Sequence, residues 1–212
     1  MLNTMKTLYF QALTLLVLMA HVSRAQTTAK VDYFGIRAGY LKASTDLTSS
    51  RNDIRLGGVA PINSFYVGGF YHHNILSWLA YRVDLNYQQK GIELQDQNGS
   101  IVGHQRLHYA GLTPLIGITP LKGLGLFVGP EANVYLGQSV ERANYGPNVT
   151  PIEFGITSRL SYRYKWIGLE VSYFEALNEY KSVDLGARFG FKNRTWQAGL
   201  LFVPALLKGR SK

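Results

Sequence analysis

The stretch Leu79 to Gly91 reads LAYRVDLNYQQKG and alternates between apolar and polar residues over nearly its whole length. Successive side chains of a β-strand leave opposite faces, so this pattern predicts an amphipathic strand. Its two rows are Leu79, Tyr81, Val83, Leu85 and Tyr87, and Arg82, Asp84, Asn86, Gln88 and Lys90. A soluble barrel or sandwich turns the apolar row inward, whereas a membrane barrel turns it outward into lipid. The class of protein depends on that choice.

The same alternation recurs along the chain and predicts an all-β fold. The further predicted strands are Asp32 to Ala43, Phe65 to Asn74, Leu107 to Thr119, Leu124 to Gly137, Pro151 to Lys165, Ile167 to Phe174 and Thr195 to Val203, and the opening strand extends to Leu94. Short connections alternate with longer polar ones, as in an up-and-down barrel with tight turns on one rim and loops on the other. We therefore expect an eight-stranded antiparallel up-and-down transmembrane β-barrel.

Three details of this topology stay open at the level of sequence. A ninth alternating segment, Val183 to Phe191, is interpreted as the outer extension of the last strand, with a bulge near Lys192-Asn193-Arg194, because single-chain bacterial barrels have even strand numbers. A ten-stranded barrel that also uses Asp53 to Ala60 is the competing topology. The segment Phe65 to Asn74 has apolar residues on both faces, and Pro114 predicts a bulge or a weakened ladder.

The first 25 residues have the pattern of a secretory signal peptide. Lys6 precedes an apolar run from Leu8 to Ala20, and Ser23-Arg24-Ala25 forms a cleavage site of the small-x-small type. The alternative is an uncleaved anchor, although the run is short for a transmembrane helix. We expect one domain, the barrel, over residues 26–212. With no cysteine, the chain can form neither disulfides nor a lipoprotein anchor.

Composition favours lipid on the outside of this barrel. Charged residues make up only 17% of the chain, which contains 22 glycines and 14 tyrosines. Glycines on the polar face suit a narrow lumen, where small and large side chains must alternate. Tyr and Trp at strand ends on the apolar face are typical of interfacial girdles. These aromatic residues are Tyr40, Tyr71, Trp78, Tyr81, Tyr87, Tyr162, Tyr164, Trp166, Tyr173 and Trp196.

The polar face carries charges of both signs, which could pair inside a closed lumen. They are Arg37, Arg82, Asp84, Lys90, Glu131, Arg159, Arg163 and Glu170. We expect these side chains to form a lumen charge network that fills the barrel and leaves no wide pore. The formal net charge of +9 falls to +7 when Lys6 and Arg24 leave with the signal peptide. An exported basic chain of this kind is expected to lie near lipid phosphates, with no nucleic acid partner.

No motif in the sequence predicts catalysis, a cofactor or a metal site. His72 and His73 are adjacent, so their side chains should leave opposite faces of a strand. His104 and His108 share a face but lack the three or four convergent ligands that metal sites usually need. No G-x-S-x-G motif and no phosphate loop occurs. We therefore expect a protein without enzymatic activity.

Four short stretches resemble the PorT-like family of outer-membrane β-barrels. They are YQQKG (Tyr87 to Gly91), TPL (Thr113 to Leu115), FVGPEANVYLG (Phe127 to Gly137) and KNRTWQAGLLF (Lys192 to Phe202). The resemblance implies an OmpA-type barrel in a Gram-negative outer membrane. The founding member is linked to protein secretion, a role that we do not extend to this chain. Such barrels commonly end on an aromatic residue, whereas this chain continues past Phe202 with VPALLKGRSK.

Two functions remain in competition. The first is a small integral outer-membrane barrel with a structural or interaction role, whose long loops, especially Lys42 to Ser64 and Ser139 to Thr150, contact lipopolysaccharide, other outer-membrane lipid or a protein partner. The second is a soluble exported β-barrel that binds a small apolar ligand inside. The facing of the row that begins Leu79, Tyr81, Val83 distinguishes the two.

Overall fold

The computed structural model describes residues 32–49, 59–95, 98–141, 151–184 and 187–207, so the expected signal peptide at 1–25 lies outside the described residues. It contains nine strands: β1 (Asp32–Ser49), β2 (Val59–Asn74), β3 (Leu79–Gln95), β4 (Ile101–Leu121), β5 (Leu124–Glu141), β6 (Ile152–Tyr164), β7 (Ile167–Ala176), β8 (Tyr180–Asp184) and β9 (Ala187–Leu207). In the described part of the chain, no helix is long and apolar enough to cross a membrane.

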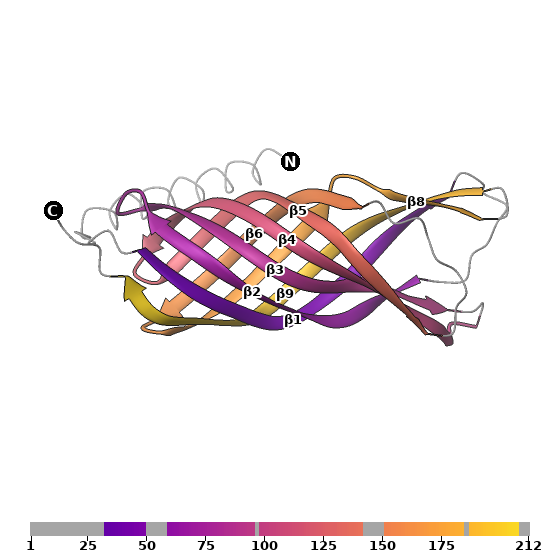
Figure 1. The fold of residues 1–212 in the computed structure, drawn as a ribbon, viewed down its shortest axis with the longest axis horizontal. Coiled ribbons are helices and arrows are strands. Elements are labelled where there is room, and N and C mark those ends of the chain that lie inside the picture. Colours follow the sequence, from indigo (N-terminus) through magenta and orange to yellow (C-terminus); the bar gives the residue numbers. More distant parts are fainter. Residues whose placement is uncertain (1–31, 50–58, 96–97, 142–150, 185–186, 208–212) are drawn as a thin grey trace, which may run out of the picture.

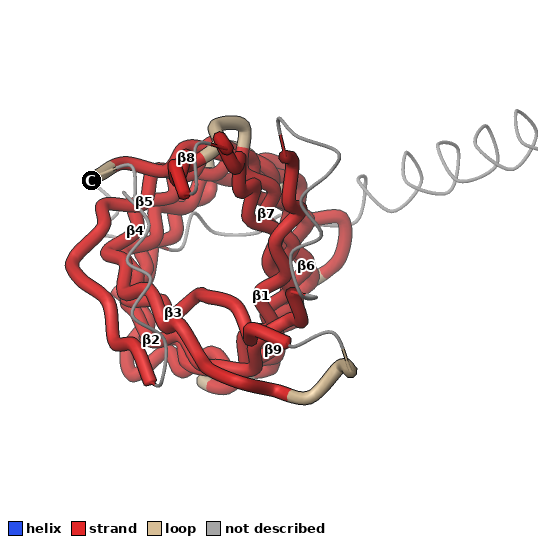
Figure 2. The backbone as a smooth tube through the Cα atoms, turned by 90° about the vertical axis from the view of Figure 1, so that its right-hand side faces the viewer, coloured by secondary structure: helices blue, strands red, loops and turns tan. Residues whose placement is uncertain are grey.

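Eight of these strands close into an antiparallel barrel, as predicted. Neighbours in the sheet follow the order β1-β2-β3-β4-β5-β6-β7-β9, and pairing of β1 with β9 closes the ring (Figures 1 and 2). The ten-stranded alternative is wrong, because the closed ring has eight members. Of its extra segment, Val59 and Ala60 begin β2, and residues 53–58 lie outside the described residues.

The ninth alternating segment contains parts of two strands. Ala187–Phe191 is the outer extension of β9, as predicted, whereas Val183 and Asp184 belong to β8, which pairs with that extension as a hairpin outside the ring (Figure 1). The bulge expected near Lys192-Asn193-Arg194 is wrong, because the β1–β9 register runs there without a shift. This extension lies beyond the closed barrel, where no polar lumen dictates which face is apolar. The register shift of this ladder lies instead between Phe34 and Ile36.

Most strands run further toward the loop rim than their alternation predicted, and β9 also runs further at its other end. β1 ends at Ser49 rather than Ala43, and β2 begins at Val59 rather than Phe65. β9 continues past Val203 to Leu207, so the segment after Phe202 begins as strand, and residues 208–212 lie outside the described residues. Around Pro114 the β4–β5 register is the same on both sides, but no pairs form between Leu112 and Ile116. In this gap Pro114 lies opposite Pro130, and the two prolines weaken the ladder without a bulge.

The apolar row of β3 faces outward. Leu85 in this row is 64% exposed, whereas Arg82 and Asp84 in the alternate row are buried at 2% and 0% exposure. In β2, whose facing was open, Phe65 and Val67 point outward and are exposed. The same alternation holds in the other barrel strands, and in β6 buried and exposed residues alternate from Ile152 to Ser161. A barrel with its apolar rows outside and its charged rows inside is inverted relative to a soluble barrel.

Glycines on the inner face make room for aromatic rings. A Cβ atom at Gly35 would meet the ring of Phe70, one at Gly125 the ring of Phe127, and one at Gly155 the ring of Phe174. Large and small side chains therefore alternate across the lumen, as the narrow cross-section of an eight-stranded barrel requires.

We expect Gly155→Val to destabilise the barrel by about 1 to 3 kcal/mol, because its side chain would overlap Phe174 and the backbone of Glu175. The matched control is Ser158→Val, on the same strand but on the exposed outer face, which should leave the free energy of unfolding nearly unchanged. Urea titration of both variants in lipid vesicles measures the difference. Equal losses would contradict the assignment of faces in β6.

Candidate functional site

The lumen holds a charge-balanced set of ionisable side chains. Among the described residues, the buried Arg and Lys number four and the buried Asp and Glu also number four. They are Arg37, Arg82, Lys90 and Arg159, with Asp84, Glu131, Glu153 and Glu170. Burying charge is costly unless each charge is paired and hydrogen bonded. The arrangement of these partners therefore decides whether the lumen is stable.

Asp84 is the centre of the first cluster, which we call the arginine cluster. Three arginines from three strands donate hydrogen bonds to its carboxylate. Arg37 Nη1 lies 2.8 Å from Oδ2 and Arg82 Nε lies 2.7 Å from Oδ1, and Arg159 Nη1 also contacts Oδ2. Because these side chains come from β1, β3 and β6, the cluster connects both walls of the barrel across the lumen.

Glu170 on β7 is the second anion of the arginine cluster. Its Oε1 accepts from Arg37 Nε at 2.5 Å and from the hydroxyl of Tyr66 at 3.0 Å, and its Oε2 accepts from Arg82 Nη2 at 3.1 Å. The guanidinium carbon of Arg37 lies 4.4 Å from the centre of the Tyr66 ring, and that of Arg82 lies 4.0 Å from the Phe70 ring. These contacts add cation–π attraction to the ion pairs.

The second cluster surrounds Lys90 and lies on the loop side of the first. Lys90 Nζ donates to Glu153 Oε2 at 2.5 Å and lies 3.9 Å from the centre of the Phe174 ring. Asn193 Nδ2 donates to the other oxygen of Glu153 at 2.6 Å. Asn133 Nδ2 donates to both Glu153 and Glu131, at 3.0 Å each. We call this group the lysine cluster.

Two glutamines join the clusters. Gln197 Oε1 accepts from Arg37 Nη2 at 2.9 Å, and Gln197 Nε2 donates to Gln88 Oε1 at 3.0 Å. Gln88 Nε2 in turn donates to Glu131 Oε1 at 2.8 Å. The arginine cluster carries one excess positive charge and the lysine cluster one excess negative charge, so the amide bridge connects two oppositely charged halves of one neutral network.

Buried apolar side chains pack on the short-turn side of this network and beside it. On the short-turn side, one buried group is Tyr33, Phe70, Leu201 and Val203, and another is Ala80, Leu115 and Phe127. Beside the network are Leu41, Ala43, Ile62 and Tyr66, and Leu107 with Tyr109, because Leu107 is paired with Lys90 and Leu41 with Gln197 across the ladders. The lumen is thus a packed core that is partly ionic and partly apolar. Figure 2 shows the backbone of the barrel as a ring, and these side chains fill the space inside it.

The structure brings together in one cluster five of the eight residues expected in the lumen charge network. Arg37, Arg82, Asp84, Arg159 and Glu170 form the arginine cluster. Lys90 and Glu131 lie in the lysine cluster, where Glu131 receives hydrogen bonds from Thr157 Oγ1 at 2.5 Å and Thr113 Oγ1 at 3.3 Å. Arg163 joins neither cluster. Its guanidinium stacks 4.3 Å from the centre of the Tyr33 ring near the short-turn rim and donates to the Lys165 carbonyl at 3.0 Å.

Sequence reasoning missed Glu153, the ionic partner of Lys90. Glu153 has the same strand parity as Thr157 and Arg159, so alternation contained the signal for its inward facing. The amide partners Gln88, Asn133, Asn193 and Gln197 were also missed. Their parity is inward too, but nothing in one sequence says which amide on one strand meets which carboxylate on another.

The histidines lie at the two rims and face as the sequence predicted. His72 points inward and stacks 4.5 Å from Tyr33, and His73 points outward with Nδ1 2.7 Å from Asp32 Oδ1. His108 Nδ1 lies 2.6 Å from the Tyr87 hydroxyl. His104 Nδ1 lies 3.7 Å from Glu93 Oε1. In the residues that the structure describes, no group of three or more His, Cys, Asp or Glu could hold a metal ion.

Comparison with known proteins gives a likeness in fold alone. No protein-family model matches the chain, and no curated protein matches it in sequence. Among solved structures, the outer membrane protein OprG from Pseudomonas aeruginosa is similar with a TM-score of 0.56 and 10% identity, over 82% of this chain and 95% of that one. The fold is that of a small outer-membrane β-barrel. Neisserial surface protein A is also similar, with a TM-score of 0.49 and 14% identity, over 81% of this chain and 96% of that one.

The outer surface agrees with this fold. Exposed apolar side chains cover every strand of the ring, from Phe34 and Ile36 on β1 to Leu200 and Phe202 on β9. All ten aromatic residues expected at the interfaces lie on the outer surface or its turns. So large an apolar surface would not be stable in water. With the apolar wall and the polar, filled lumen, the fold assigns the chain to the outer membrane.

Proposed function

We propose that this protein is a small integral outer-membrane barrel without a conducting lumen, whose role is structural or interactive and is carried by its loop rim. The observation that supports this is the neutral network of eight buried charges, which occupies the lumen together with the buried apolar groups packed below and beside it. A lumen of that kind offers neither a channel nor an apolar ligand cavity, and no catalytic motif marks the chain. Function in such a scaffold belongs to the loops.

We also propose that the chain is a member of the PorT-like family, although no family model matches it. This membership rests on the four short stretches from Tyr87 to Phe202 and on the eight-stranded architecture that they imply. A role in protein secretion does not follow from either observation. Lipopolysaccharide and a protein partner remain the proposed contacts of the long loops.

Extraction and gel mobility test the barrel directly. We expect the mature chain to require detergent for extraction and to migrate differently when boiled and unboiled, because a closed hydrogen-bonded barrel resists detergent until it is heated. Recovery as a soluble monomer without detergent would instead support an exported barrel that binds a small apolar ligand.

Conductance tests the filled lumen. We expect the purified protein in planar bilayers to give no stable current steps above those of the bare membrane, because the two clusters and their glutamine bridge span the cross-section. Well-defined, reproducible steps would show that the network opens, and the non-conducting role would then be wrong.

The loop role is tested by shortening the loops while keeping the barrel. A variant in which residues 50–58 and 142–150 are each replaced by a short Gly-Ser turn should still show heat-modifiable mobility. If the loops carry function, this variant should fail to restore the outer-membrane defects of a deletion strain that the full chain restores. Full restoration by the loop-shortened variant would overturn the proposal.

A further inference from the structure

The outer wall has a sharp boundary on the loop side. On five strands, an outward aromatic residue is followed two positions nearer the loops by a polar one. These pairs are Tyr40 and Lys42, Phe65 and Asn63, Tyr87 and Gln89, Tyr173 and Glu175, and Trp196 and Arg194. The polar members share the face of the aromatic ones, because residues two apart on a strand point the same way. Their heads therefore lie where lipid headgroups meet the wall.

On one side of the barrel this boundary is a cluster of charges on β1, β7 and β9. Lys192 Nζ lies 3.0 Å from Glu175 Oε1, and Arg194 Nη2 lies 2.9 Å from Asp46 Oδ2 and 3.6 Å from Glu175 Oε1. Lys42 is paired with Trp196 across the β1–β9 ladder, and its side chain is exposed. The group holds three cations and two anions, so it carries net positive charge. We call it the wall charge cluster.

Two cations in the wall charge cluster have donors to spare. Both acidic contacts of Arg194 are made through Nη2, which leaves Nη1 without an acidic partner among the described residues, whereas Nε is buried in the wall. Within the described part of the chain, Lys42 makes no ion pair. Asp46 and Glu175 therefore orient Arg194 and Lys192 without saturating them. An oriented guanidinium beside a free ammonium is suited to a phosphate group, which accepts several charge-assisted hydrogen bonds.

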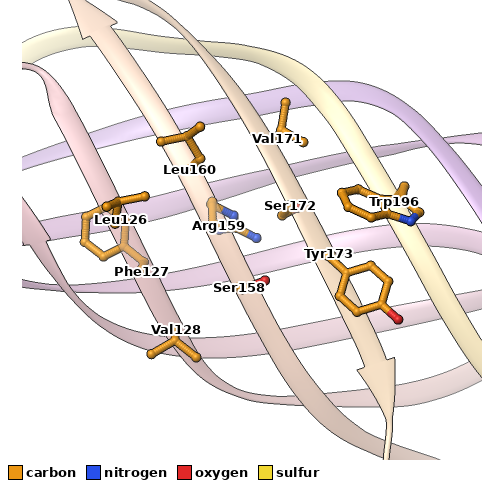
Figure 3. A pocket seen from close by; sticks show the side chains of 10 residues that line it. All are labelled: Leu126, Phe127, Val128, Ser158, Arg159, Leu160, Val171, Ser172, Tyr173 and Trp196. Atoms are coloured by element: carbon orange, nitrogen blue, oxygen red, sulfur yellow. The ribbon is translucent and has the colours of Figure 1, made fainter. Parts of the chain in front are cut away.

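Directly beside this cluster the wall is hollowed. A groove of about 520 Å³ crosses β5, β6, β7 and β9 on the outer surface (Figure 3). It is lined by Leu126, Val128, Ser158, Leu160, Tyr173 and Trp196, among others. Ser158 is the small residue at its centre, because its neighbours across the ladders are Val128 and Tyr173. The surface of the groove is mostly apolar, so it is suited to contact with a hydrocarbon chain.

The groove and the wall charge cluster are continuous. Tyr173 and Trp196 line the groove, and on the same strands Glu175 and Arg194 stand next on the same face. The Tyr173 hydroxyl also lies 3.5 Å from Glu175 Oε2. A single molecule could therefore place an acyl chain in the groove and an anionic head against the cations.

We propose that this wall binds one phosphorylated glycolipid of the outer leaflet, with a phosphate at Lys42 and Arg194 and an acyl chain in the groove over Ser158. The cluster lies on the loop side of the barrel, and long loops of such barrels are extracellular, so the adjoining leaflet is the one built of lipopolysaccharide. Basic groups beside apolar grooves are a known way to hold acidic lipid heads. The inference rests on the outer-membrane location but not on a function of the loops.

Native mass spectrometry of the full mature barrel, titrated in detergent with diphosphoryl lipid A, tests this proposal. We expect Arg194→Gln and Lys42→Gln each to weaken binding about tenfold, the loss that corresponds to one charge-assisted hydrogen bond. Ser158→Trp should also weaken binding by filling the groove. The matched control is Arg106→Gln, another outward basic residue near the loop side, on β4, which donates to Gln89 at 2.9 Å and does not line the groove.

The outcomes separate a built site from general attraction to anionic lipid. Unchanged affinity for Arg106→Gln, together with weaker binding of phosphatidylglycerol than of lipid A, would support the proposal. An equal loss for Arg106→Gln, or equal binding of the two lipids, would overturn it. Heat-modifiable mobility of each variant shows that the barrel has folded. Failure of lipid selectivity with a folded barrel would leave the proposed role of the loops intact.

Discussion

Asp84→Ala is expected to be among the most damaging single substitutions in this protein, with a cost of about 3 to 5 kcal/mol in the free energy of unfolding. The substitution removes the carboxylate that receives hydrogen bonds from Arg37, Arg82 and Arg159, and it leaves Glu170 as their one anionic partner. Breaking a buried ionic group by removing one member is costly because the remaining charges stay buried without compensation.

Urea titration in lipid vesicles, followed by tryptophan fluorescence, measures this loss. The matched control is Asn86→Ser, two residues along the same lumen face, which removes one hydrogen bond to Arg37 at 3.1 Å and should cost about 1 kcal/mol. Adding Arg159→Met to Asp84→Ala should recover part of the stability, because it removes one unpaired positive charge. If Asp84→Ala costs no more than Asn86→Ser, the arginine cluster does not stabilise the barrel as described.

Val83→Arg is the second substitution expected to have a large effect, about 2 to 4 kcal/mol. Val83 lies on the outer face of β3 between Tyr81 and Leu85, and its neighbours across the ladders are Tyr71 and Pro114. An arginine there must place its guanidinium in the hydrocarbon region or bend toward a headgroup. The same vesicle titration measures the loss.

The control for Val83→Arg is Ile101→Arg. Ile101 begins β4 at the loop end and is 52% exposed, so the same kind of change is made outside the apolar band. Its effect should be within about 1 kcal/mol of zero. A larger loss at Ile101 than at Val83 would mean that the apolar band has been placed at the wrong height on the barrel.

Most of the fold could be predicted from the apolar–polar alternation, because every strand of a membrane barrel has one face toward lipid and one toward the lumen. Each residue faces either lipid or a filled lumen, so parity decides polarity from Leu79 to Tyr87 as it does in β6. Where the rule ceases to apply, prediction failed. β8 and Ala187–Phe191 of β9 pair outside the closed ring, where this rule does not apply, and the bulge predicted next to them does not exist.

Membership of the lumen network could be predicted only in part for a related reason. Parity says that Arg37, Arg82, Asp84, Arg159 and Glu170 point inward, and a closed lumen forces such charges together. Height along the barrel is a different quantity, because it depends on strand tilt and stagger, which the sequence does not display. Arg163 therefore shares the inward parity but lies near the short-turn rim, while Glu153 lies at the height of Lys90.

Arg37 stabilises the junction of the two terminal strands through side-chain hydrogen bonds inside the barrel. β1 and β9 meet edge to edge as the first and last strands of the ring, and Arg37 on β1 reaches β3, β7 and β9 through Asp84, Glu170 and Gln197. The β1–β9 junction is thus held by side-chain hydrogen bonds inside the lumen as well as by backbone hydrogen bonds. A circular permutant, with the native ends joined and new ends at the Lys122-Gly123 turn, would keep all of these side-chain contacts. We therefore expect the β1–β9 junction to be no weaker than the other strand pairs when the ring unfolds.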